Sequence, residues 1–132
     1  LAIIRELSTR YKVLSEVGSK DDSVTITPSR WVELIGRELE AGAWKVITEG
    51  RESGTGGIYR PNGDVKDGLL EEIKETFDTT QILFEAPVKK QQAWFIKQFG
   101  TNVNLGNIPP EEVISVETLR LGVRGDTLLT FH

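Results

Sequence analysis

The 132-residue sequence has no cysteine, no methionine and one histidine. The lack of cysteine excludes disulfides, thiolate metal sites, iron–sulfur clusters and cysteine nucleophiles, so any chemistry has to use oxygen and nitrogen groups. No apolar run reaches the roughly 18 residues of a membrane-spanning helix, and the start lacks a signal-peptide pattern. We therefore expect a cytoplasmic chain with no membrane partner.

The chain carries a small excess of acidic residues, with 20 Asp and Glu against 16 Lys and Arg and a formal net charge of -4. That balance argues against the broad basic surface of a nucleic-acid-binding domain, and it leaves room for a local basic pocket that binds an anionic metabolite. With 38% apolar residues, the sequence has enough material for one hydrophobic core. We predict a single domain over residues 1–132 and no nucleic-acid partner.

Four short aliphatic or β-branched runs predict β-strands, at residues 12–17, 45–50, 81–86 and 102–107. Helical patterns separate these runs, and residues 1–10 have the periodicity of a helix that is already under way, without an N-cap. This start indicates that the chain begins inside a larger protein.

Strands that alternate with helices predict an α/β fold with a parallel sheet and right-handed crossovers. Four such units fit either a small open sheet or half of a (β/α)8 TIM barrel, which needs about 250 residues. The helical start favours the second interpretation, in which this chain covers the last four β-α units of the barrel.

Local signals also define one helix start and part of the core. Thr27 followed by Pro28 is typical of an N-cap and the first helical position. The tryptophans Trp31, Trp44 and Trp94 flank predicted strands or lie on helices, so we expect all three in the core.

Glu16, Glu49 and Glu85 occupy similar places near the ends of the first three predicted strands. Neighbouring parallel strands lie about 5 Å apart, so the three carboxylates should meet at the carboxyl edge, where α/β folds place their ligands. Such a cluster suits a hard divalent cation or acid–base work. The simpler alternative is that each glutamate only caps its strand.

The second predicted strand leads into a loop that is rich in glycine, residues 50–57, with Arg51 and Glu52 among the glycines. Bare backbone amides and a guanidinium together bind phosphate or carboxylate. The loop could also be merely flexible, since glycine is the default wherever a positive φ is needed.

Three further polar residues are candidates for the functional site, and each also has a simpler structural explanation. Lys20 lies in the first loop and could be a solvated lysine beside Asp21. Asn104 could orient a substrate carboxylate, or could only satisfy backbone groups in a turn. Arg120 could bind an anion, or could complement the dipole at the end of the last helix.

Five segments together resemble phosphosulfolactate synthases. The similarity runs in consistent order over nearly the whole chain, and it covers only the carboxyl-terminal half of that family. The segments are residues 12–20 (KVLSEVGSK), 40–57 (EAGAWKVITEGRESGTGG), 84–87 (FEAP), 103–108 (VNLGNI) and 117–127 (ETLRLGVRGDT).

The resemblance implies a (β/α)8 barrel of which these strands are the fifth to the eighth. It implies a magnesium-dependent C–S lyase that adds sulfite to phosphoenolpyruvate and gives (2R)-3-phosphosulfolactate. That reaction is an early step of one route of coenzyme M biosynthesis and of sulfolactate formation. The family also implies a homo-oligomer.

The resemblance further suggests roles for the candidate residues. Lys20 would be the general acid, with Glu16 as a second catalytic residue. Glu16 would also be one of three acids on the metal side, together with Glu49 and Glu85. The substrate-binding residues that we select are Arg51, Gly54, Gly56, Asn104 and Arg120.

Two other functions compete with this one. Plant heat-stress-associated proteins resemble the same family without keeping the Gly-Arg-Glu-Ser-Gly loop, and they suggest a non-catalytic role for the scaffold. Another magnesium-dependent enzyme that forms an enolate, such as an aldolase, would use similar strand-end acids and a lysine. The loop at residues 50–54 favours the synthase over the non-catalytic relative.

Overall fold

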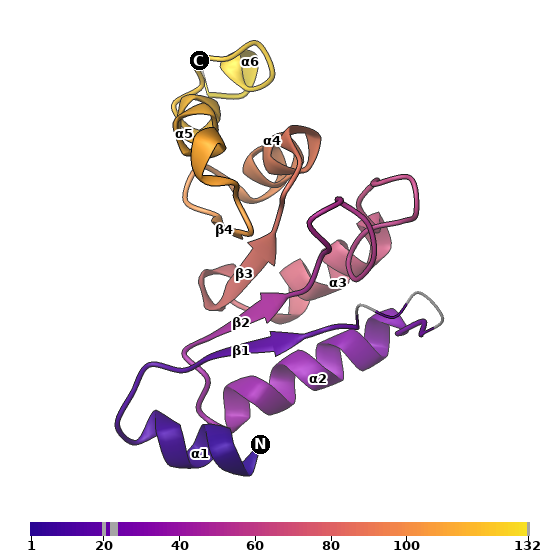
Figure 1. The fold of residues 1–132 in the computed structure, drawn as a ribbon, viewed down its shortest axis with the longest axis vertical. Coiled ribbons are helices and arrows are strands. Elements are labelled where there is room, and N and C mark those ends of the chain that lie inside the picture. The colour runs from indigo at the N-terminus through magenta and orange to yellow at the C-terminus, as the bar shows by residue number, and fades with distance from the viewer. Residues whose placement is uncertain (20, 22–23, 132) are drawn as a thin grey trace.

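The computed structural model describes residues 1–19, 21 and 24–131, which form an α/β fold around a parallel sheet (Figure 1). The sheet has four strands in the order β1-β2-β3-β4, and each neighbouring pair is parallel. Their bounds are β1 Leu14–Val17, β2 Lys45–Thr48, β3 Ile82–Glu85 and β4 Asn104–Gly106. Each strand lies within its predicted range, so the α/β class and the parallel sheet are confirmed.

The helices follow the strands as the alternating pattern predicts. They are α1 Ala2–Ser8, α2 Pro28–Glu40, α3 Asp67–Thr76, α4 Lys89–Phe99, α5 Val113–Arg120 and α6 Leu128–Phe131, with short 3-10 turns η1 Thr79–Gln81 and η2 Pro110–Glu112. Helix α2 begins as expected, because Thr27 Oγ1 accepts the amide of Arg30 at 3.3 Å and Pro28 is the first helical residue.

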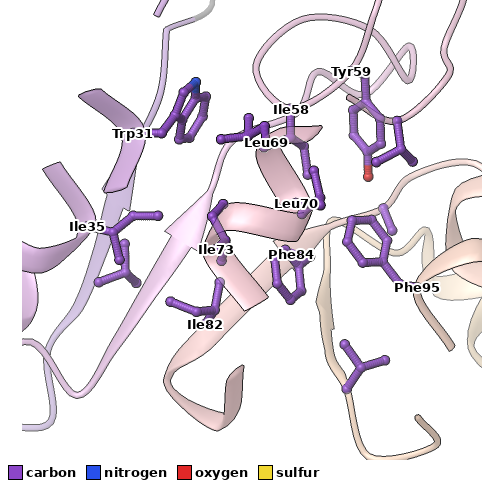
Figure 2. Close-up of a cluster of buried hydrophobic side chains, with 14 of the residues drawn as sticks. Trp31, Ile35, Ile58, Tyr59, Leu69, Leu70, Ile73, Ile82, Phe84 and Phe95 are labelled. Carbon is purple, nitrogen blue, oxygen red and sulfur yellow. The ribbon is translucent and has the colours of Figure 1, made fainter. Parts of the chain in front are cut away.

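The core lies between the sheet and its helices, which cover one face of the strands. Alternate side chains such as Val46 and Phe84 point to that side and are fully buried. Phe84 stacks on Phe95 of α4 with ring centroids 4.7 Å apart, and Trp31 of α2 lies in the same cluster (Figure 2). The opposite face is less covered, as the 49% exposure of Leu14 shows. The carboxyl edge of the sheet therefore has one side toward the helices and one side toward the open face.

One core expectation is wrong. Trp31 is buried and Trp94 is partly buried against the core, but Trp44 is 46% exposed. Trp44 precedes β2, where the ammonium groups of Lys12 and Lys45 each lie 4.7 Å from its ring centroid. Cation–π contacts of this kind stabilise an exposed indole without burying it.

The helices that the structure describes are all too short or too polar to cross a membrane.

Candidate active site at the carboxyl edge of the sheet

The register of the strands separates the three glutamates into two levels. Glu16 pairs with Ile47, which in turn pairs with Leu83, so Glu16 lies two residues below Glu85. At the rise of a β-strand, this offset is roughly 7 Å along the sheet. Glu49 and Glu85 instead follow directly after paired residues and share one level.

The predicted three-carboxylate metal cluster therefore does not form within the part of the chain that the structure describes. Among residues 1–19, 21 and 24–131, no three acidic or histidine side chains are placed to hold an ion together. The physical reason is the stagger between β1 and β2, which keeps the Glu16 carboxylate below the level of the other two.

Glu49 is the most buried of the three, with 6% exposure. Its amide donates to the carbonyl of Val17 at 3.0 Å, and its own carbonyl accepts the amide of Ile58 at 3.1 Å. Gly18 makes room for it, because a Cβ at that glycine would lie 2.7 Å from the Cβ of Glu49. The first and second loops thus enclose this carboxylate between them.

The glycine-rich loop folds as a tight turn directly above the end of β2. Gly54 donates its amide to the carbonyl of Arg51 at 2.8 Å, and Arg51 donates its own amide to the carbonyl of Thr55 at 2.9 Å. Gly54, Gly56 and Gly57 have φ values of 81, 74 and 56°. These angles are costly for other residues, which explains why the turn needs glycine.

Arg51 and Glu85 come together in a hollow on the face of the sheet that the helices leave open. This inner hollow has a volume of about 730 Å³, and Gly50, Gly106 and Asn107 also line it. Arg51, Glu85 and backbone of the glycine loop thus border one space at the carboxyl edge. Such a set can bind a phosphate or carboxylate together with a cation.

A second hollow, of about 420 Å³, lies on the other side of the glycine loop. Ser19 and Asp21 of the first loop line this outer hollow together with Gly56 and Lys66. Lys20 itself lies outside the described residues, but both of its neighbours border this space.

Lys66 is a residue that the sequence analysis missed. Its ammonium donates to the carbonyl of Gly57 at 2.9 Å, which brings a cation to the outer hollow. The only signal was its place shortly before the third helix, and a solvated lysine gives the same signal.

Asn104 and Arg120 lie away from this edge. The side-chain amide of Asn104 donates to the carbonyls of Thr80 and Ile82 at 3.0 and 3.1 Å, at the amino end of β3. Arg120 donates to the carbonyl of Thr101 and, at 2.7 Å, to that of Val103, just before β4. Through these bonds both side chains hold backbone segments in place at the amino edge of the sheet.

The position of Arg120 at the amino end of the sheet follows from topology, and its role in substrate binding stays a prediction. Helix α5 runs back from the carboxyl edge, so its last turn returns to the amino end of the sheet. The role of Asn104 in substrate binding likewise stays a prediction. The amide residue at the carboxyl edge is Asn107, which lines the inner hollow and donates to the carbonyl of Gly50 at 3.4 Å.

Tyr59 joins the glycine loop to the end of β3. It is 1% exposed, its hydroxyl donates to the backbone carbonyl of Glu85, and its ring lies where a side chain at Gly50 would have to go. Figure 2 shows the hydroxyl pointing into the buried cluster beside Phe84 and Phe95. Burial, with a smaller contribution from the charge of Glu85, raises the pKa of Tyr59 well above its ordinary range.

The raised pKa of Tyr59 predicts how stability depends on alkaline pH. The folded state keeps a proton that the unfolded state releases near pH 10, so this contribution is complete below about pH 10 and is lost above it. We expect Tyr59→Phe to lower the free energy of unfolding by about 1 kcal/mol at pH 7, through loss of the hydrogen bond. The difference should shrink between pH 10 and 11 in urea unfolding, and a constant difference would contradict the assignment.

The chain is similar to known proteins over almost its whole length. The family model of (2R)-phospho-3-sulfolactate synthase (ComA) matches residues 1–126. The phosphosulfolactate synthase of Bacillus subtilis is 50% identical over 129 residues, which cover 96% of this chain and 51% of that protein. The phosphosulfolactate synthase of Methanocaldococcus jannaschii is 47% identical over 129 residues, which also cover 96% of this chain and 51% of that protein.

A third relative, the phosphosulfolactate synthase of Methanothermobacter thermautotrophicus, is 45% identical over 121 residues, which are 89% of this chain and 47% of that protein. The chain thus spans about half the length of the curated relatives it matches. The matched residues include the strand ends, the glycine loop and both hollows. By sequence over almost its whole length, the chain belongs to the (2R)-phospho-3-sulfolactate synthase family.

Proposed function

We propose that this chain forms the carboxyl-terminal half of a phosphosulfolactate synthase, which adds sulfite to phosphoenolpyruvate and gives (2R)-3-phosphosulfolactate. The observation that carries the proposal is the inner hollow, where Arg51 and Glu85 face one space below the glycine turn. Three relatives that bear the name phosphosulfolactate synthase support the same activity.

The fold of the active protein is, in this proposal, a closed (β/α)8 barrel. Within the described residues, no helix covers the sheet face that carries Leu14, Ile47 and Leu83, while the relatives are about twice as long as this chain. In a barrel, such a face becomes the packed interior, and the outer edges of β1 and β4 pair with further strands. We also propose a homo-oligomer, on the resemblance to the family alone.

The residues at the inner hollow suit a magnesium ion. Mg²⁺ is usually bound through one or two carboxylates, with waters and substrate phosphate oxygens completing its shell. Glu85 lines the hollow and would hold it, and Glu49, which shares its level, and Glu16, two residues lower, are the further acids that we propose on the metal side. A bound Mg²⁺ would stabilise the negative charge that develops on the substrate carboxylate.

The chain's own residues would bind the anions and supply the proton. Arg51 and the amides of the glycine turn would bind the phosphate or the sulfite. Sulfite sulfur forms a bond to the methylene carbon, the double-bond electrons move toward the carboxylate, and the carbon that bears the phosphate then takes a proton. By resemblance to the family, Lys20 would donate that proton.

The retained loop also weighs against a non-catalytic role. The Gly-Arg-Glu-Ser-Gly segment, which the heat-stress-type relatives lack, forms a turn closed by the Gly54 amide and lines the inner hollow through Arg51. A loop kept only as a spacer has no need for glycines at positive φ at residues 54, 56 and 57, directly after an arginine.

The test is sulfonate formation by the complete gene product that carries this chain. Phosphoenolpyruvate, sulfite and Mg²⁺ are supplied, and phosphosulfolactate is detected by mass spectrometry. We expect product, a fall of at least about 10-fold when a chelator removes divalent ions, and recovery on adding Mg²⁺. A folded protein with Mg²⁺ that makes no product would refute the synthase, and cleavage of a phosphorylated aldol substrate would then favour the aldolase-like alternative.

A further inference from the structure

Gln91 is a buried polar residue in the first turn of α4, with 2% exposure. Its Oε1 accepts the amide of Val88 at 3.3 Å. Its Nε2 donates to the carbonyls of Gly54 and Gly63, at 2.9 and 3.0 Å. Both hydrogens of this amide therefore serve the loop between β2 and α3.

The two carbonyls that Gln91 binds end two similar turns of that loop. The amide of Gly54 bonds to the carbonyl of Arg51 at 2.8 Å, and the amide of Gly63 bonds to that of Arg60 at 2.9 Å. Each turn begins with an arginine and ends with a glycine at positive φ, 81 and 86°. One buried amide thus joins two turns that are far apart in the loop.

The first turn is also packed tightly against the start of α4. A Cβ at Gly54 would lie 2.6 Å from Cγ2 of Val88 and 3.1 Å from Nε2 of Gln91. These contacts leave no space for the turn to slide along the helix. The position of Arg51, three residues earlier, therefore depends on where Gln91 holds Gly54.

We propose that Gln91 is a positioning residue, whose amide fixes both turns and thereby sets Arg51 at the inner hollow. A long loop without a helix or strand of its own has many conformations to lose, and a site on such a loop needs a rigid support. Gln91 supplies this support from a helix. The kinetic part of this inference rests on the proposed function, and the part that concerns loop order does not.

Gln91→Glu in the complete gene product tests the inference. The variant keeps the size of the side chain and an acceptor for Val88, but it turns an oxygen toward two carbonyl oxygens. Amide hydrogen exchange over residues 50–63 should become at least about 10-fold faster, while that of α2 stays unchanged. Gln98→Glu, the same change at an exposed position of the same helix, should leave both segments as they are.

Steady-state kinetics give a second readout. Misplacing Arg51 should raise KM for the substrate that it binds, phosphoenolpyruvate or sulfite, about 10-fold in Gln91→Glu and change kcat less, because the loop would be ordered only part of the time. A role in stability alone would lower the amount of active protein and leave KM unchanged. Gln98→Glu should match the wild type in both constants.

Each outcome decides between these roles. Unchanged exchange at residues 50–63, or equally faster exchange in α2, would overturn the inference. If Gln91→Glu does not fold, Gln91→Met, which lacks both donors and adds no charge, should still show the faster loop exchange; failure of both to fold would make Gln91 a general core residue. A wild type without synthase activity would refute the proposed function and leave the exchange result to decide on Gln91.

Discussion

Replacing Lys20 by alanine should lower kcat for sulfonate formation by a factor of about 10² to 10⁴, the usual contribution of a general acid. The expectation rests on the family resemblance of residues 12–20. Sulfite can still attack the methylene carbon in the variant, but the resulting carbanion-like species lacks its proton donor. The measurement is initial-rate kinetics at saturating phosphoenolpyruvate and sulfite, with Mg²⁺ present.

Lys12→Ala is the matched control for this substitution. Lys12 lies at the other end of the same β1 segment, where its ammonium contacts the exposed ring of Trp44. Loss of that contact should cost less than about 1 kcal/mol of stability and leave kcat unchanged. An equal loss of kcat in both variants would mean a general effect of charge or folding, and full activity of Lys20→Ala would remove Lys20 from the proton transfer.

Short-range signals in the sequence predicted the fold well. Each strand lies within its expected range, and the Thr27–Pro28 helix start has the expected cap. These features depend on residues close together in the chain, through side-chain period and capping. The same holds for the glycine loop, whose turn at Arg51 uses residues only a few positions apart.

The meeting of the three glutamates could not be predicted in the same way, because it depends on register. The segments that begin at Lys12 and Lys45 have the same pattern, lysine, two aliphatic residues, a hydroxyl residue and glutamate. The structure nevertheless pairs Leu14 with Lys45, so the two repeats are two residues out of step. Such a stagger in register between parallel strands is a property of the whole sheet, as in barrels.

Buried polar residues were the other feature that the sequence did not predict. Gln91 lies in a Lys-Lys-Gln-Gln run that has the composition of a solvated helix start, yet it is 2% exposed. Tyr59 likewise had no distinguishing pattern, although its hydroxyl binds the carbonyl of Glu85. The carbonyls to which these two side chains donate lie more than twenty residues away in the chain, so only the folded structure shows these bonds.

Gly57→Ala should destabilise the protein by at least about 3 kcal/mol, because the new methyl group meets backbone that cannot move freely. A Cβ at this position would overlap the carbonyl oxygen of Glu49 and lie 2.7 Å from its carbonyl carbon. That oxygen accepts the amide of Ile58, which returns the loop to the end of β2. The φ of 56° at Gly57 adds backbone strain for any residue with a side chain.

Gly68→Ala gives the comparison that separates this clash from a general effect of losing glycine. Gly68 lies in α3, and nothing is within 4 Å of the Cβ position. Alanine there should stabilise the protein by a few tenths to about 1 kcal/mol, through its higher helix propensity. Urea unfolding of the complete gene product measures both. If Gly57→Ala were as stable as the wild type, the loop could not return to β2 by the route described, and the position that we assign to Arg51 would fail with it.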